Sequence, residues 1–229
     1  MKNTKYIVAT IKNWNINQYH KTIPKLKGSW HLITNPKKLT FKYVKSINPR
    51  YIFFPHWSEK VDKKITSNFE CICFHETNVP YGRGGSPIQN LIIRGHKNTV
   101  VTALRMMNKL DAGPVYFKYP LKLNGTAQEI YERATKIIFN IINNMINNKL
   151  EPIAQTGKPV IFKRRKMEQS VITKKIKSLN KLYNYIRMLD AETYPRAYLH
   201  YGNLKIELTK PKIKKGQLTA QTNIKIIKK

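Results

Sequence analysis

The sequence predicts an α/β fold with a mostly parallel sheet, followed by a small α+β unit. Short β-branched and aromatic runs alternate with stretches long enough for a helix or a crossover connection, and this alternation is typical of parallel sheets. After Lys149 the pattern changes, because Pro152, Gly157 and Pro159 interrupt it. A length of 229 residues and a hydrophobic content of 41% suffice for one well-packed domain with a modest appendage.

The first part of the chain is expected to contain the strands of the main sheet and four helices. The strands are the apolar runs at residues 6–10, 30–34, 51–54, 69–75, 99–106 and 115–123. Short helices are expected at 39–46, 60–67 and 87–94, and a long one from 127 to about 148, where isoleucines recur at three- and four-residue spacing. Ser86, before Pro87, is expected to cap the third helix, and Thr126 forms a capping box with Glu129.

The remainder of the chain divides into a linker and a second unit. A basic stretch at residues 162–166 precedes an amphipathic helix expected at 178–189. Three strands are expected after that helix, at 197–200, 204–208 and 224–227. We therefore place a first domain at residues 1–150, a linker at 151–172 and a small C-terminal domain at 173–229.

The chain is strongly basic, with 43 Lys and Arg residues against 12 acidic ones and a formal charge of +31. Such a charge suits a polyanionic partner such as nucleic acid. However, only nine of the 43 are Arg, the residue best suited to bidentate phosphate recognition, and the lysines are scattered over every segment. Lys, Asn and Ile are also abundant together, as expected for a genome rich in A and T, so a functional charge and a compositional bias both stay open.

Compartment and redox state follow from what the sequence lacks. No run of about 18 apolar residues is present, and the apolar run near the N-terminus is too short for a signal peptide, so we expect a cytoplasmic protein with no membrane segment. The two cysteines, Cys71 and Cys73, have neither the spacing of a redox CxxC motif nor that of a zinc site. We expect reduced thiols and no metal.

A polar, glycine-rich loop at residues 74–89 follows a strand that is expected to be buried. His75 ends that strand, and Asp111 stands at a later strand boundary. Ligands of open α/β sheets bind at the carboxyl ends of the strands, and a histidine positioned by an aspartate can carry protons in group transfer. His75 and Asp111 are therefore the candidate catalytic pair, although many histidines near turns serve only as hydrogen-bonding groups.

The order and spacing of several motifs narrow this interpretation. They are His75, Pro80, Arg83-Gly84, Pro87-Ile-Gln89, Thr99-Val-Val-Thr102 and Leu110-Asp-Ala-Gly113. This arrangement resembles the signature of the 10-formyltetrahydrofolate-dependent formyltransferases over residues 69–149. Weaker similarity at residues 163–170 and 186–197 looks like the linker and C-terminal start of sugar N-formyltransferases. The resemblance implies a Rossmann-like catalytic domain.

The resemblance also implies a reaction in which a substrate amine attacks the formyl carbon of 10-formyltetrahydrofolate. His75 would polarise the formyl oxygen or move a proton, and Asp111 would orient His75 and help to deprotonate the amine. The sequence departs from the family at Cys73, where the family carries an Asn. A thiol is a poor hydrogen-bond donor, so either Asn78 in the adjacent loop supplies the missing amide or the activity is reduced.

The resemblance also implies further site residues. Cofactor-binding residues would come from two segments, Pro55, His56 and Trp57 in the first and Arg105, Met107 and Asn108 in the second. For the first segment, an aromatic plug under a loop is an equally good interpretation. Substrate would contact Thr77, Pro80 and Arg83, although Arg83 beside two glycines also suits a structural turn.

The function predicted first is N-formylation of a nucleotide-linked amino sugar for surface polysaccharide synthesis, by a possible homodimer formed through the C-terminal unit. Methionyl-tRNA formyltransferase is the alternative within the family, and the charge of +31 suits it. Only about 60 residues follow the linker, fewer than the tRNA-binding domain of that enzyme requires, so nucleic acid is not the expected partner. A catalytically inactive, basic RNA-binding protein is the alternative outside enzymology.

Overall fold

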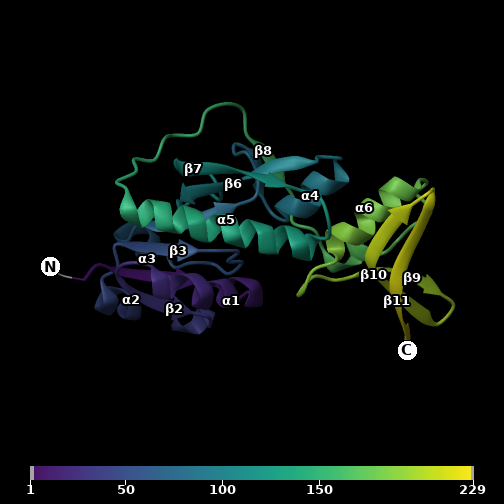
Figure 1. Ribbon diagram of the computed structural model, residues 1–229, viewed down its shortest axis with the longest axis horizontal. Helices are drawn as coiled ribbons and strands as arrows, with labels where there is room; N and C mark the ends of the chain where they lie inside the picture. Colours follow the sequence, from purple (N-terminus) through teal and green to yellow (C-terminus); the bar gives the residue numbers. More distant parts are fainter. Residues whose placement is uncertain (1–2, 228–229) are drawn as a thin grey trace. The chain divides into compact units, whose positions relative to one another are not determined.

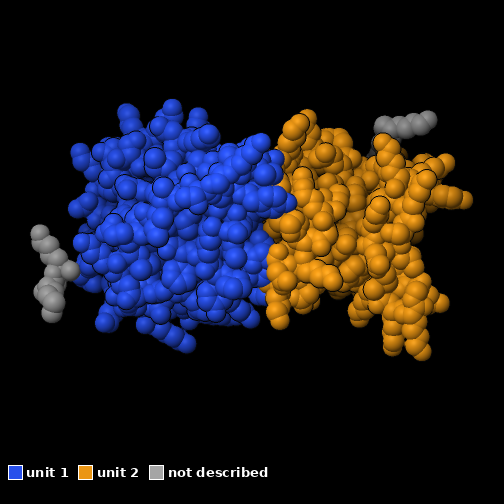
Figure 2. All heavy atoms as spheres, turned by 90° about the horizontal axis from the view of Figure 1, so that it is seen from above, with its two compact units in different colours: residues 1–84, 99–121, 132–161 blue, residues 85–98, 122–131, 162–229 orange. Residues whose placement is uncertain are grey.

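The computed structural model describes residues 3–227, which divide into two compact units (Figure 2). The first unit comprises residues 1–84, 99–121 and 132–161. The second comprises residues 85–98, 122–131 and 162–229, so two short segments from the first half of the chain group with its C-terminal part. The three-part division at residues 150 and 172 stays a prediction.

The first unit is built on a six-stranded sheet in the order β2-β1-β3-β4-β6-β7. β1 pairs with β2 and β3 in parallel, β3 pairs with β4 in parallel, and β4 pairs with β6 antiparallel. The prediction of an α/β fold with a mostly parallel sheet is therefore confirmed. The strands are β1 (Lys5–Ala9), β2 (Ser29–Ile33), β3 (Tyr51–Phe54), β4 (Cys71–His75), β6 (Asn98–Arg105) and β7 (Val115–Lys122).

Helices flank this sheet, and the longest of them, α5 (Ala127–Asn147), lies in front of its strands in Figure 1. α2 (Phe41–Ile47) begins at Thr40, whose Oγ1 accepts a hydrogen bond from the Tyr43 amide at 3.2 Å. α3 (Lys63–Asn68) begins at Asp62, which accepts from the Lys64 amide. Both caps place the helix starts two or three residues later than the sequence prediction.

One helix, α1 (Asn13–Thr22), was not predicted from the sequence. Its ten residues are mostly polar and contain no apolar repeat at helical spacing. Tertiary contacts form it instead, since Trp14, Asn15 and Tyr19 are buried. The short helices η1 (Ile23–Lys25) and η2 (Pro36–Lys38) complete the connections around β2.

The hydrophobic core of the first unit supports the strands that carry the candidate site. Ile7, Ile52 and Phe54 from β1 and β3 pack with Ile47 of α2 and Ile65 of α3. Ile7 and Ile52 are fully buried. Because β3 and β4 are held in this core, the residues that follow their carboxyl ends are presented by rigid elements.

The second unit combines helices with an antiparallel sheet in the order β11-β10-β9, and α6 packs against this sheet (Figure 1). β10 and β11 are longer than predicted because they form one hairpin. Lys215 and Gly216 both have positive φ, as a tight two-residue hairpin turn requires. The elements are α4 (Pro87–Ile93), η3 (Met167–Ser170), α6 (Leu179–Leu189), β9 (Ala197–Tyr201), β10 (Leu204–Lys214) and β11 (Gln217–Ile226).

The expected linker contains regular structure. β8 (Val160–Phe162) pairs with β5 (Tyr81–Gly84) in a two-stranded sheet, and the Val160 amide donates to the Pro80 carbonyl at 3.1 Å. Neither strand was predicted, because each is only three or four residues long and gains its partner from a distant segment. The segment at 151–161 is thereby held against the loop that follows β4.

The two helix caps predicted from the sequence had different outcomes. The capping box at α5 is confirmed, since the Thr126 amide donates to Glu129 Oε2 at 2.7 Å and the Glu129 amide donates to Thr126 Oγ1 at 3.3 Å. Ser86 does occupy the N-cap position of α4, with Pro87 at the start of the helix as predicted, but its side chain makes no capping hydrogen bond. Ser86 has a φ of +51°, and its hydroxyl accepts a hydrogen bond from the Arg165 amide at 3.1 Å instead of one from α4.

Both cysteines are free thiols, Cys71 buried and Cys73 half-buried. Burial raises the pKa of the Cys71 thiol to about 12, so it is uncharged at neutral pH. Within residues 3–227, no cluster of His, Cys, Asp and Glu has the arrangement of a metal site. None of the helices that the structure describes combines the length and apolar character needed to cross a membrane.

We predict that Ile52→Ala lowers the free energy of unfolding by about 2–5 kcal/mol, because truncation of a fully buried side chain leaves a cavity in the centre of the sheet. Urea denaturation measures the loss. Ile161→Ala is the control, since Ile161 is 61% exposed, and it should change the stability by no more than about 0.5 kcal/mol. Equal losses in the two variants would contradict this description of the core.

Candidate active site

His75 lies at the carboxyl end of β4 and is buried. Its Nε2 lies 2.7 Å from the Gly82 carbonyl oxygen. A carbonyl oxygen only accepts hydrogen bonds, so Nε2 carries the hydrogen and the tautomer of the neutral ring is fixed. Nδ1 then faces Asp111, with 3.8 Å between Nδ1 and Oδ2. The structure therefore brings the predicted catalytic pair together.

Asp111 is held in place by its own loop. Its φ of +50° lies in the left-handed region, which residues other than glycine adopt only when their surroundings enforce it. Asp111 Oδ2 accepts a hydrogen bond from the Gly84 amide at 2.9 Å. Two residues on, a Cβ added at Gly113 would lie 1.8 Å from the Arg105 carbonyl oxygen, so only glycine permits the loop to return this closely to β6.

Cys73 lies two residues before His75 on β4, opposite Leu104 of β6. Its Sγ is 3.7 Å from the Leu104 carbonyl oxygen, a weak contact. Burial raises the pKa of the Cys73 thiol, and the charge of Asp111 raises it further, so the thiol is neutral at physiological pH. Cys73 thus occupies the predicted position near the pair without supplying a strong donor.

Asn78 is exposed, and its side chain is engaged away from the pair. Asn78 Oδ1 accepts a hydrogen bond from Lys118 Nζ at 2.6 Å, and Lys118 also donates to the Val79 carbonyl at 2.9 Å. Partial burial lowers the pKa of the Lys118 ammonium. These groups border a cavity of about 490 Å³ formed by residues 78–80, 115–118 and 153–156. A role of Asn78 as oxyanion donor stays a prediction.

The three residues assigned to substrate contribute to the structure of the loop. Thr77 is fully buried; its Oγ1 donates to the Gly82 carbonyl at 3.3 Å. The Pro80 carbonyl accepts from Val160, as described above. Arg83 is buried and donates to Gln155. Arg83 therefore lies in a strand and not in the turn considered from the sequence, and contact of these three residues with a substrate stays a prediction.

His56, assigned from the sequence to the cofactor, is part of a buried polar network. The Trp14 indole N–H donates to His56 Nδ1 at 3.0 Å, and His56 Nε2 lies 2.9 Å from Glu76 Oε1. Burial alone would raise the pKa of Glu76, but electrostatic interaction with His56, a hydrogen bond from His56 and electrostatic interaction with His75 lower it. Glu76 is therefore an ionised carboxylate already committed to His56.

Trp57, the next residue, is different. Its Nε1 is buried and has no hydrogen-bond partner among the described residues. The ring packs edge-on against Phe54, with 5.9 Å between ring centroids. A buried donor without a partner is uncommon in proteins and marks a place where a bound molecule could supply an acceptor. Pro55 is buried beside it, whereas Arg105, Met107 and Asn108 are exposed.

Sequence reasoning missed Glu76 and Gln155. Glu76 offered a weak signal, since an acidic residue directly follows the candidate histidine at a strand end. Gln155 offered none, because it lies in the expected linker and its partners are distant in the chain. Gln155 accepts hydrogen bonds from Arg83 and donates to the backbone of the Asp111 loop.

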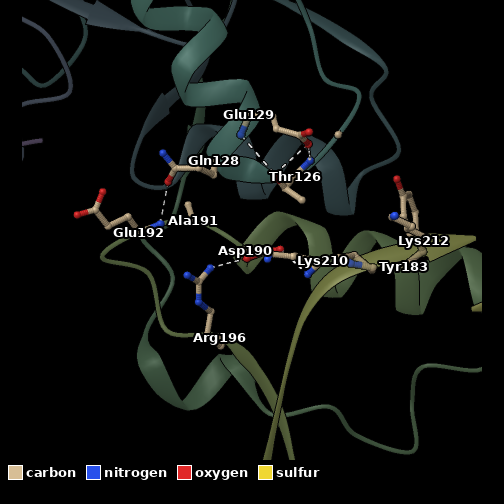
Figure 3. A pocket seen from close by; sticks show the side chains of 12 residues that line it. Thr126, Gln128, Glu129, Tyr183, Asp190, Ala191, Glu192, Arg196, Lys210 and Lys212 are labelled. Atoms are coloured by element: carbon tan, nitrogen blue, oxygen red, sulfur yellow. Dashed lines mark hydrogen bonds and ion pairs between the residues drawn. The ribbon is translucent and has the colours of Figure 1, made fainter. Parts of the chain in front are cut away.

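A larger cavity of about 600 Å³ lies in the second unit (Figure 3). Asp190 pairs there with Arg196 at 2.6 Å and accepts a hydrogen bond from the Lys210 amide at 2.6 Å, while Glu129 is bound to Thr126. These acidic groups already have partners, and none of the predicted site residues lines the cavity. The candidate active site is therefore the cluster around His75 and Asp111.

Comparisons with known proteins place the chain in one family. Residues 167–225 match the family model described as "Methionyl-tRNA formyltransferase, C-terminal domain". The structure named "Methionyl-tRNA formyltransferase from Clostridium thermocellum" is 45% identical and superimposes with a TM-score of 0.95 over 97% of this chain and 99% of that one. A methionyl-tRNA formyltransferase from Thermotoga maritima is 23% identical over 180 residues, which are 75% of this chain and 57% of the relative.

The chain thus spans about half the length of the curated relatives it matches. A 4-N formyltransferase from Francisella tularensis has a TM-score of 0.66 over 95% of this chain and 96% of that one, but at 15% identity it shows only a common fold. The match to the Clostridium thermocellum structure is close in sequence and nearly complete in both chains. On these grounds, and with the predicted histidine and aspartate brought together at the strand ends, the chain belongs to the formyltransferase family.

Proposed function

We propose that this protein transfers a formyl group from 10-formyltetrahydrofolate to the amine of methionyl-tRNA. The observation that carries the reaction is the approach of Asp111 to His75 at the carboxyl end of β4. The observation that carries the acceptor is the 45% identity to a protein named methionyl-tRNA formyltransferase over almost the whole of both chains. The formal charge of +31 also suits a polyanionic acceptor.

The amino-sugar acceptor, preferred on the sequence alone, becomes the second candidate. Its main support was the short C-terminal unit, which had argued against tRNA. That argument loses its force because the Clostridium thermocellum chain, which bears the tRNA enzyme's name, is matched over 99% of its length. The sugar-modifying neighbour from Francisella tularensis is similar in fold at only 15% identity.

The residues around Trp57 fit a flat heterocycle such as a pterin. The unpartnered Trp57 indole N–H can donate to an acceptor on the ring. Met107 and Asn108 are exposed and can offer backbone groups to the cofactor, whereas the Arg105 amide is already bonded to Pro114 and the His56 ring to Glu76. When bound, 10-formyltetrahydrofolate supplies an activated formyl group.

Side chains of the protein then accept the proton that the amine must lose. His75 Nε2–H stays on the Gly82 carbonyl, so Nδ1 is the nitrogen that can accept a proton. The Asp111 carboxylate beside Nδ1 stabilises the imidazolium that forms, and the Gly84 amide keeps that carboxylate in place. The neutral Cys73 thiol adds no charge to this arrangement.

The acceptor is tested by assaying formylation of both substrate classes. We expect the purified protein, supplied with 10-formyltetrahydrofolate, to formylate methionyl-tRNA and to leave a panel of nucleotide-linked amino sugars unmodified.

His75→Ala and Asp111→Ala should each lower kcat by about 10²–10⁴-fold, the range for removal of a positioned acid–base group. His20→Ala, at an exposed histidine, is the control. Formylation of a sugar alone would overturn the tRNA assignment, and full activity in either site variant would overturn the catalytic pair.

Folate binding is tested by thermal denaturation. A folate analogue at a hundredfold excess over its Kd should stabilise the protein by about 2.7 kcal/mol, because it binds only the native state. Trp57→Phe keeps the ring but removes the indole N–H, and we expect it to weaken binding and reduce the rise in Tm. Trp30→Phe is the matched control, since the Trp30 indole donates to the Lys27 carbonyl. An unchanged Tm in the wild type at millimolar analogue would contradict folate binding by this protein.

Cys73 stands where the formyltransferase family carries an Asn, and restoring that Asn is predicted to increase activity. Cys73→Asn should raise kcat, by up to about 10²-fold, because an amide in place of the weakly bonded thiol restores a donor for the developing oxyanion. Asn78→Ala should change kcat little, since Lys118 already engages the Asn78 side chain. Steady-state kinetics measure both variants. No gain at Cys73 together with a large loss at Asn78 would instead assign the donor to Asn78.

A further inference from the structure

Gln155 makes four hydrogen bonds with a single amide side chain. Its Oε1 accepts from Arg83 Nε at 3.0 Å and from Arg83 Nη2 at 2.7 Å. Its Nε2 donates to the Asp111 carbonyl at 2.9 Å and to the Gly113 carbonyl at 2.7 Å. A guanidinium only donates and a carbonyl only accepts, so the orientation of the amide is unambiguous. Every donor and acceptor site of the side chain is used.

These bonds tie three distant segments together. Arg83 lies in β5, next to Gly84, whose amide binds the Asp111 carboxylate. Gln155 lies two residues beyond Ile153, which is bonded in both directions to Val115 at the start of β7. The loop with Asp111 is therefore fastened at its carboxylate by Gly84 and at its backbone by Gln155.

Asp111 needs this second attachment. Its φ of +50° is unfavourable for a residue with a side chain, and a local backbone that is free to relax would leave that region. Relaxation would rotate the carboxylate away from His75, from which it is already separated by 3.8 Å. The amide of Gln155 binds the carbonyl of Asp111 itself, the group that would have to move.

We propose that Gln155 is a positioning residue for formyl transfer, which fixes the Asp111 loop so that its carboxylate faces His75. The proposal rests on the formyl-transfer function argued above. Gln155 does not touch the reacting groups in this scheme. It acts through Asp111 and uses Arg83, a residue first assigned to the substrate, as its anchor.

Steady-state kinetics of Gln155→Ala and Gln155→Glu test the proposal. Both variants should lose about 10²-fold in kcat, the loss that a displacement of about 1 Å at the reacting groups can cause, with KM for both substrates within about twofold of the wild type. Gln155→Glu is informative because it keeps the acceptor for Arg83 but presents no N–H to the Asp111 and Gly113 carbonyls. Full activity of Gln155→Glu would overturn the proposal. Lys158→Ala, at an exposed position in the same segment, is the control and should retain wild-type kcat.

A double-mutant cycle separates positioning from a general structural effect. If Gln155 acts through Asp111, Gln155→Ala should cost less than about threefold in kcat in an Asp111→Asn background. An additive loss of about 10²-fold in that background would show that Gln155 acts elsewhere and would overturn the proposal. Equal Tm values for the single variant and the wild type, or a loss of kcat that persists well below Tm, exclude partial unfolding as the cause.

Hydrogen exchange provides a readout that does not depend on activity. Peptides that cover residues 106–114 should exchange at least about threefold faster in Gln155→Ala than in the wild type, while peptides from β1 and β3 stay unchanged. If the wild type forms no product with either acceptor, the proposed function fails, and unchanged exchange in the loop would separately overturn the role of Gln155. Faster exchange combined with normal kcat would also overturn it, since the loop would then be loosened without consequence for the reaction.

Discussion

The geometry of the candidate site depends on the close return of the loop at residues 106–114 to the end of β6. The backbone at Gly113 approaches the Arg105 carbonyl too closely for any side chain. This approach turns Asp111 back toward His75, which the pairing of β4 with β6 holds at a fixed position. A bulkier residue at 113 would separate the two groups even if both were retained. Close backbone packing, and not the identity of the two side chains alone, makes the pair.

Much of the main sheet could be predicted from the sequence, because its strands β1, β3 and β4 are short apolar runs that are buried along almost their whole length. Helix α1 could not, since its ten residues lack an apolar repeat and are ordered by contacts of Trp14, Asn15 and Tyr19. β5 and β8 escaped prediction for a similar reason. They are short, and each is stabilised by a partner about 80 residues away in the chain.

The residues of the candidate site likewise divide into those that the sequence could predict and those that it could not. His75 and Asp111 could be found because they stand in motifs at strand boundaries, where α/β folds place ligands. Glu76 and Gln155 could not be assigned, because their positions depend on the distant residues His56 and Asp111. Ser86 is a residue type that caps helices, yet it has a positive φ, and its hydroxyl accepts a hydrogen bond from the Arg165 amide instead of one from α4. Local patterns therefore identify candidate site residues better than the residues that position them.

The two carboxylates near His75 have different contacts, since Asp111 faces His75 Nδ1 and Glu76 contacts His56. Glu76 is adjacent in the chain and buried, but its charge is committed to His56. Cys73 is close, but burial and the Asp111 charge keep its thiol protonated. Asp111 is thus the carboxylate that faces His75 Nδ1, as the proposed proton transfer requires. Since His75 Nε2 is bound to the Gly82 carbonyl, Nδ1 is the ring nitrogen that faces Asp111, and this arrangement depends on two backbone hydrogen bonds and on the contact between His56 and Glu76.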